Sequence, residues 1–201
     1  FLCLMDIYLD VDRTLFNTAL FDELQWSILR REYAVDTQER ARQKRFFVHN
    51  DGMYYYDFSA HMKDIGLDPR EVYSALSQSE LGDGRLEYKG VSELISWIRE
   101  RGTVRLLTYG ADDYQRLKVA LCPSLENLEI IATKRGKGHF FRKQPAQEGV
   151  WMVDDKPIGD ELPDSVNFIQ AVEYNDIVPP QNISWQLARS PREVQILLAK
   201  M

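Results

Sequence analysis

Hydrophobic and polar positions follow two rhythms along this chain, and the change between them falls near residue 90. From there to the end, short apolar runs alternate with amphipathic segments, which predicts alternating strands and helices. Such alternation is typical of a parallel sheet with helices on both faces. The expected strands cover 103–110, 127–134, 149–155 and 164–172, and the expected helices cover 90–102, 111–122 and 190–200.

The segment before residue 90 predicts one buried strand followed by a mostly helical region. The strand, Ile7 to Val11, is an apolar run that ends where charged residues begin. Asp68 and Ser190 have the residue type and the position of helix N-caps. Helices are expected over 21–33, 57–67 and 68–81, and a glycine-rich loop over 82–90.

These patterns predict an α/β fold in which a doubly wound parallel sheet is interrupted by a helical insertion after its first strand. The core would comprise residues 1–16 and 87–201, and the inserted helical cap would comprise residues 17–86. Ligands of such sheets bind beyond the carboxyl ends of the strands. Candidate chemistry is therefore expected where the strands end.

Composition narrows the classes of function. A chain of 201 residues with 44% hydrophobic content suits one compact domain, or a core with a smaller insertion. The net charge of −6 argues against general nucleic-acid binding, which needs a basic face. No apolar run approaches the roughly 20 residues that span a membrane, and the opening FLCLM is too short for the core of a signal peptide.

Cysteine and histidine usage adds little further chemistry. Cys3 and Cys122 form no disulfide framework or metal-finger spacing, so the reduced cytoplasm is the expected compartment. The histidines have no ligand spacing among themselves, and we assign them no metal. They are His49, His61 and His139.

Carboxylates follow two of the expected strands. The first strand ends at Asp10 and Asp12, and the strand over 149–155 ends at Asp154 and Asp155, while Thr108 closes another. Carboxylates packed together repel one another, which a hard divalent cation would relieve. Mg²⁺ favours carboxylates, water and phosphate oxygens, so this pattern predicts a magnesium and phosphate site.

The order of these motifs resembles the haloacid dehalogenase-like (HAD) phosphatase superfamily. Asp-x-Asp-x-Thr comes first, then a threonine after a strand, then a lysine, then Asp-Asp after a strand. Each motif alone is weak, but four in this order, each at the end of an apolar strand, are specific. The likeness covers the whole chain, including a helical cap inserted after the first motif.

The resemblance implies a role for each matching residue. Asp10 would be the nucleophile that forms an aspartyl-phosphate, and Asp12 would protonate the leaving oxygen and later activate water. Thr108 would hold a phosphoryl oxygen, with Tyr109 and Gly110 beside it in the substrate site.

The metal and the motif lysine follow from the same likeness. Mg²⁺ would bridge Asp10, the backbone carbonyl of Asp12 and Asp155, with Asp154 in support. A lysine would neutralise charge on the nucleophile and the phosphate. Lys134, Lys137 and Lys143 all lie in the right segment; Lys137, which starts a turn leading into a helix, is the first choice.

The chain departs from the family pattern at Arg13, where many members have glycine, and Arg13 would contact the cap or the phosphate. In the cap, Tyr54, Tyr55, Tyr56 and Phe58 would either frame the leaving group or form the core of the cap itself. The charged run over 39–45 would either attract an anionic substrate or form a solvated helix face.

The resemblance therefore implies Mg²⁺-dependent hydrolysis of a phosphomonoester, with a small phosphorylated metabolite as substrate. A nucleotidase or phosphotransferase activity is the alternative among enzymes. A catalytically weak member that serves as a binding or regulatory protein is a third reading, against which the intact aspartates argue.

Overall fold

The fold is built around one parallel sheet. The computed structural model describes residues 5–50, 52–172 and 183–200, so the prediction made for Cys3 lies outside the described residues. The sheet has six strands in the order β5-β4-β1-β6-β7-β8, and every neighbouring pair is parallel. The strands are β1 (Met5–Leu9), β4 (Gly102–Tyr109), β5 (Glu129–Thr133), β6 (Val150–Asp154), β7 (Val166–Ala171) and β8 (Gln186–Ala188).

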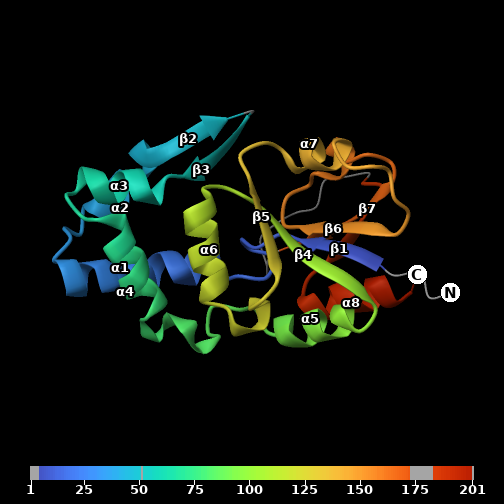
Figure 1. The fold of residues 1–201 in the computed structure, drawn as a ribbon, viewed down its shortest axis with the longest axis horizontal. Helices are drawn as coiled ribbons and strands as arrows, with labels where there is room; N and C mark the ends of the chain where they lie inside the picture. The colour runs from blue at the N-terminus through green and yellow to red at the C-terminus, as the bar shows by residue number, and fades with distance from the viewer. Residues whose placement is uncertain (1–4, 51, 173–182, 201) are drawn as a thin grey trace.

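Helices cover both faces of this sheet, because alternate side chains of each strand point to opposite faces. In β1, Ile7 and Leu9 belong to one buried apolar cluster and Tyr8 to another. The first cluster lies under α5 (Val91–Arg99), α6 (Asp112–Ala120) and α8 (Pro191–Ala199), and the second lies under α7 (Lys137–Arg142) (Figure 1). The predicted fold class, a doubly wound α/β sheet with an inserted cap, is confirmed.

The segment after β1 forms a separate group of elements beside the sheet (Figure 1). Its helices are α1 (Thr18–Tyr33), α2 (Glu39–Arg42), α3 (Phe58–Asp64) and α4 (Pro69–Ser77). It also contains an antiparallel hairpin, β2 (Phe47–Asn50) and β3 (Met53–Tyr56), which the sequence analysis did not predict. The division into a core over 1–16 and 87–201 and a cap over 17–86 stays a prediction.

Element ends show how local chemistry decides the boundaries. Both predicted N-caps are confirmed: the Asp68 side chain accepts from the Arg70 N–H at 2.9 Å, and Ser190 accepts from the Glu193 N–H at 3.2 Å. The first strand ends at Leu9, two residues earlier than predicted, because the Val11 carbonyl accepts hydrogen bonds from a tight turn. Single 3₁₀ turns cover Gln43–Phe46, Glu80–Asp83, Pro123–Leu125 and Gly159–Glu161.

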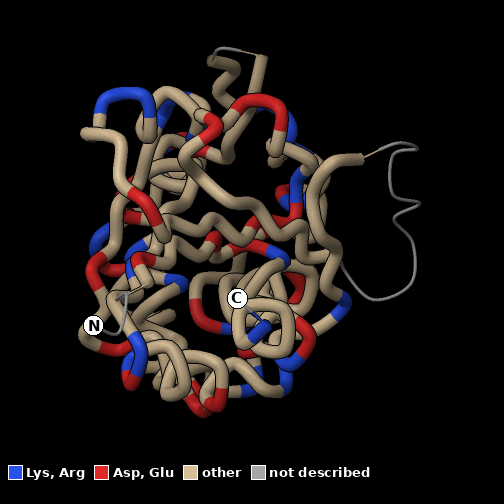
Figure 2. Tube along the Cα trace, turned by 90° about the vertical axis from the view of Figure 1, so that its right-hand side faces the viewer, with Lys and Arg blue, Asp and Glu red and all other residues tan. Residues whose placement is uncertain are grey.

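Charged residues are mixed in sign over the side of the molecule that Figure 2 presents, where acidic and basic positions intersperse along the trace. Within the described part of the chain, no helix is both long and apolar enough to cross a bilayer.

Candidate active site at the carboxyl end of the sheet

The carboxyl ends of the three central strands bring the predicted residues together. β1 pairs with β4 on one side and with β6 on the other, so the residues that follow them share one edge. The Asp10 N–H donates to the Val153 carbonyl at 2.8 Å, which fixes Asp10 beside the end of β6. Asp10, Thr108, Asp154 and Asp155 thus line one cavity of about 600 Å³.

Three of the carboxylates form a candidate cation site. One oxygen from each of Asp10, Asp154 and Asp155 lies within 4.8 Å of the others, and all three residues are buried. Burial and the charges of neighbouring aspartates raise the pKa of Asp10 and of Asp155. Raised pKa values mean that the negative charge of these carboxylates is not fully compensated by nearby positive charge. A magnesium ion would compensate it, and carboxylate oxygens are ligands that Mg²⁺ prefers. The residues present therefore fit a magnesium ion.

Lys137 supplies the positive charge that the cluster does have. Its Nζ lies 2.5 Å from Asp10 Oδ1 and 2.5 Å from Asp154 Oδ2. Although burial acts in the opposite direction, the charges of Asp10 and Asp154 raise the pKa of Lys137, so the amine stays protonated. The other two lysines lie elsewhere: Lys134 has its Nζ 5.7 Å from the centre of the Tyr55 ring, and Lys143 is exposed.

Thr108 offers an unused hydroxyl to this cavity. The residue is 1% exposed, and its Oγ1 has no hydrogen-bond partner among the described residues. Leaving a buried hydroxyl unpaired costs about 1–3 kcal/mol. A phosphoryl oxygen in the cavity would accept from this hydroxyl and remove that cost.

Asp12 lies apart from the three-carboxylate cluster and is held by other groups. Its carboxylate contacts Lys118 Nζ at 2.7 and 2.8 Å and accepts from Thr18 Oγ1 at 2.7 Å and Gln115 Nε2 at 3.0 Å. Although burial opposes the shift, Lys118 and these donors lower the pKa of Asp12. The proposed metal contact through the Asp12 backbone carbonyl stays a prediction.

The sequence analysis missed the three partners of Asp12. Gln115 and Lys118 lie three residues apart on α6 and are buried, so they share the face that packs inward. Their spacing places both side chains on one face of the helix, but their burial and their contact with Asp12 depend on how α6 packs. Thr18, at the start of α1, offered no comparable signal.

Tyr109, Gly110 and Arg13 also line the cavity, and their role in binding substrate stays a prediction. The Tyr109 hydroxyl donates to the Asn50 carbonyl at 3.2 Å, which ties the hairpin to the core. Gly110 has a φ of +150°, and a Cβ there would lie 2.7 Å from Gln115 Nε2. Gly110 therefore makes room for the amide that holds Asp12.

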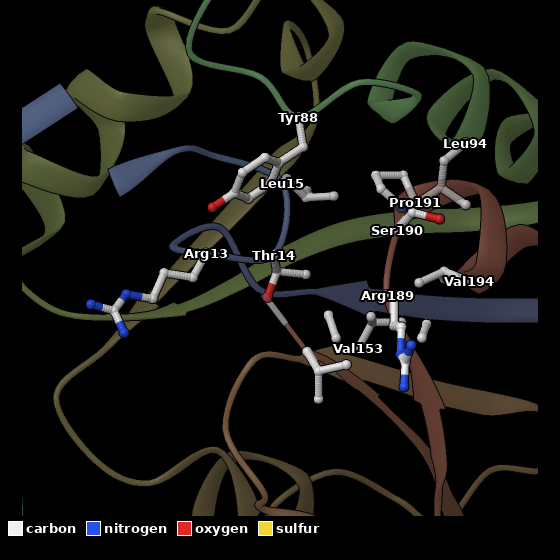
Figure 3. Close-up of a pocket in the computed structure, with 13 residues that line it drawn as sticks. Arg13, Thr14, Leu15, Tyr88, Leu94, Val153, Arg189, Ser190, Pro191 and Val194 are labelled. Atoms are coloured by element: carbon white, nitrogen blue, oxygen red, sulfur yellow. The ribbon is translucent and has the colours of Figure 1, made fainter. Parts of the chain in front are cut away.

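Arg13 has a φ of +60°, in the left-handed region that glycine adopts most easily. Figure 3 shows Arg13 pointing away from Thr14, which faces a second, much smaller cavity. That cavity, of about 20 Å³, lies between the turn after β1 and the start of α8 and is the size of one water molecule.

The aromatic residues of the cap divide between its core and the cavity. Tyr56 is buried, with its hydroxyl 2.7 Å from His61 Nδ1, and it also borders the cavity, whereas Phe58 is fully buried. Tyr54, in contrast, is 60% exposed and lines the cavity together with the half-buried Tyr55.

The charged run over 39–45 makes ion pairs within the protein. Arg40 Nη2 lies 2.7 Å from Asp22 Oδ2, and Arg42 Nη1 lies 2.6 Å from Glu39 Oε1. These contacts favour the interpretation that the run is a solvated helix face and not a site that attracts an anionic substrate.

Comparisons with known proteins add information about the fold. No family model matches the sequence, and no curated protein matches it. Among solved structures, a haloacid dehalogenase-like hydrolase from Burkholderia xenovorans LB400 is 17% identical with a TM-score of 0.69, covering 98% of each chain. YfnB from Bacillus subtilis, described as a HAD hydrolase and bound to magnesium, is 14% identical with a TM-score of 0.61, over 97% of this chain and 98% of that one.

CbbY from Rhodobacter sphaeroides, in complex with phosphate, is 15% identical with a TM-score of 0.58, over 98% of this chain and 100% of that one. A dehalogenase and a defluorinating L-2-haloacid dehalogenase are also among the matches, with TM-scores of 0.60 and 0.63. At these identities the likeness shows the fold alone. The chain has the fold of the HAD superfamily hydrolases, and the matches include dehalogenases and a protein in complex with phosphate.

Proposed function

We propose that this protein hydrolyses phosphomonoesters of small metabolites with Mg²⁺ as cofactor, through an aspartyl-phosphate on Asp10. One observation carries the proposal: the Lys137 ammonium joins Asp10 to Asp154 beside Asp155, in a cavity that also holds the unpaired hydroxyl of Thr108. The proposed nucleophile, the cation site and the donors for phosphate thus lie together at the carboxyl edge of the sheet.

The residues divide the reaction into two steps. In the first, an Asp10 carboxylate oxygen attacks phosphorus, the bond to the leaving oxygen breaks, and Asp12 gives that oxygen a proton. In the second, Asp12 takes a proton from a water molecule whose oxygen attacks phosphorus, which releases phosphate and restores Asp10. Lys137 and Thr108 hold phosphoryl oxygens in both steps.

Asp12 has to change partners between these steps. In the described conformation Lys118 keeps it ionised, which suits the base that activates water. Protonation of the leaving oxygen requires Asp12 to exchange its contact with Lys118 for one with the substrate.

A bound magnesium ion would neutralise carboxylate and phosphoryl charge and so lower the barrier to attack. Asp10, Asp154 and Asp155 would hold it. The magnesium in YfnB and the phosphate in CbbY, two proteins of the same fold, support this assignment. The proposed substrate is a small phosphorylated metabolite in the cytoplasm. A nucleotidase or phosphotransferase activity with the same chemistry is the alternative.

Hydrolysis of p-nitrophenyl phosphate tests the proposal. Phosphate release should require Mg²⁺, stop in EDTA, and fall to background in Asp10→Asn. The matched control is chloride release from 2-chloropropionate, because dehalogenases share the fold. Chloride release without phosphate release would overturn the proposal.

A further inference from the structure

The cavity extends well beyond the space that a phosphate needs, and the cap supplies its far wall. Its volume of about 600 Å³ lies within the range of roughly 300–1,000 Å³ that holds a drug-sized ligand. The cap contributes mostly ring and apolar side chains to this wall. They are Ala19, Phe21, Phe47, Met53, Tyr54, Tyr55 and Tyr56.

The hairpin that carries most of these rings is fixed to the core. The Asn50 side chain donates to the Lys134 carbonyl at 2.5 Å, and the rings of Tyr55 and Tyr109 meet edge to face with centroids 5.8 Å apart. Figure 1 shows the β2–β3 hairpin reaching from the cap towards β5. The aromatic wall is therefore in place before a substrate arrives.

The cap contributes little charge to this wall. Among the described residues lining the cavity, the cap contributes one charged side chain, Asp22, which pairs with Arg40 at 2.7 Å. The cationic side chains that line the cavity belong to the core, which also holds the proposed phosphate site. They are Arg13, Lys118, Lys137 and Lys156. A second phosphate placed against the cap would meet no cap cation of the described lining, and the nearby Arg40 already pairs with Asp22.

We infer that the leaving group carries a flat, unsaturated ring and no second anionic group, the chemistry of a nucleoside 5′-monophosphate. This inference rests on the proposed function, since it places the phosphate at Asp10. The exposed face of Tyr54 offers a surface for stacking, and Asp22 and Gln43 offer polar atoms to hydroxyl or amino groups of the ligand.

A matched pair of substrates isolates the contribution of the leaving group's ring to kcat/KM. AMP and ribose 5-phosphate have the same primary phosphate ester, so their leaving oxygens react alike and only the base differs. We expect kcat/KM for AMP to exceed that for ribose 5-phosphate by at least about fivefold, the lower end of measured stacking effects. Fructose 1,6-bisphosphate should be hydrolysed more slowly than fructose 6-phosphate.

Variants of the hairpin separate ring recognition from damage to the fold. Tyr54→Ala and Tyr55→Ala should each lower the ratio of kcat/KM for AMP to that for ribose 5-phosphate by roughly 5-fold or more. Val48→Ala is the control, because Val48 pairs with Tyr55 in the hairpin, is 37% exposed and lies outside the cavity lining; its ratio should not change.

The outcomes that overturn the two proposals differ. Equal kcat/KM for AMP and ribose 5-phosphate, or an unchanged ratio in both tyrosine variants, refutes the ring-bearing leaving group while phosphate release still supports the phosphatase. Phosphate release from none of the esters, p-nitrophenyl phosphate included, refutes the proposed function itself.

Discussion

Replacing Lys137 by methionine removes the one lysine that joins the carboxylates of the candidate site while keeping most of the side-chain volume. Lys137 Nζ lies 2.5 Å from both Asp10 Oδ1 and Asp154 Oδ2, and the three residues are buried. Removing one partner from a buried, hydrogen-bonded charge pair destabilises a protein by about 3–5 kcal/mol. For a chain of this size that corresponds to a fall in Tm of about 6–20 °C.

The fall in Tm caused by Lys137→Met should be smaller when protons or Mg²⁺ compensate the charge of the carboxylates. At pH 5 the carboxyls left behind bind protons, because burial raises the pKa of Asp10 and of Asp155, so the fall in Tm should be smaller than at pH 8. Added Mg²⁺ should recover part of the loss at pH 8. Phosphate release should stay at background even with Mg²⁺, since the charge on the phosphoryl group would lose its lysine partner.

Thermal unfolding of Lys137→Met, Lys134→Met and Lys143→Met at both pH values, with and without Mg²⁺, is the assay. Lys134 and Lys143 are exposed lysines in the same stretch and serve as matched controls, whose Tm should shift little. A Lys137→Met protein with the Tm of the wild type at pH 8 would refute the reasoning, since it would mean that the buried lysine contributes no net stabilisation.

The remaining predictions concern protons, Asp12 and the turn at Gly110. Burial raises the pKa of Asp10 to about 7 and of Asp155 to about 8, so these two carboxyls bind protons more tightly in the folded metal-free protein than in the unfolded chain. The stability of the metal-free protein should therefore fall as pH rises from about 4 to about 8, and calorimetry should detect proton release when Mg²⁺ binds at pH 6. Lys118→Met should raise the pKa of Asp12 and move the acidic limb of the pH–rate profile to higher pH; an unmoved limb would mean that Asp12 is not the group that titrates. Gly110→Ala should destabilise the protein by about 1–3 kcal/mol in urea unfolding, because its Cβ would meet Gln115 Nε2 at 2.7 Å.

Much of the sheet could be predicted from the sequence because its strands are apolar runs that end in polar residues. Ile7 and Leu9 lead directly into Asp10, and the run from Val150 leads into Asp154. Parallel pairing then requires their carboxyl ends to meet, so the cluster at the sheet edge follows from the strand pattern.

The hairpin and the setting of Asp12 were missed for different reasons. The aromatic cluster at 54–56 and 58 was interpreted as the core of the cap or as a frame for the leaving group, although Asn-Asp-Gly at 50–52 is a turn signal that favours a hairpin. The contacts of Asp12 join residues 103 and 106 positions apart, and no local pattern encodes such pairs. They depend on how α6 packs against the turn after β1.

Detection of a phosphorylated Asp10 tests the central claim most directly. The protein would be mixed with Mg²⁺ and a phosphomonoester that it hydrolyses, quenched in acid, digested, and mapped by mass spectrometry. The account predicts one added phosphoryl group on the peptide that carries Asp10, removable by hydroxylamine and absent in Asp10→Asn and in EDTA. Turnover with no phosphoryl group on Asp10 under rapid quench, or wild-type turnover in Asp10→Asn, would contradict it.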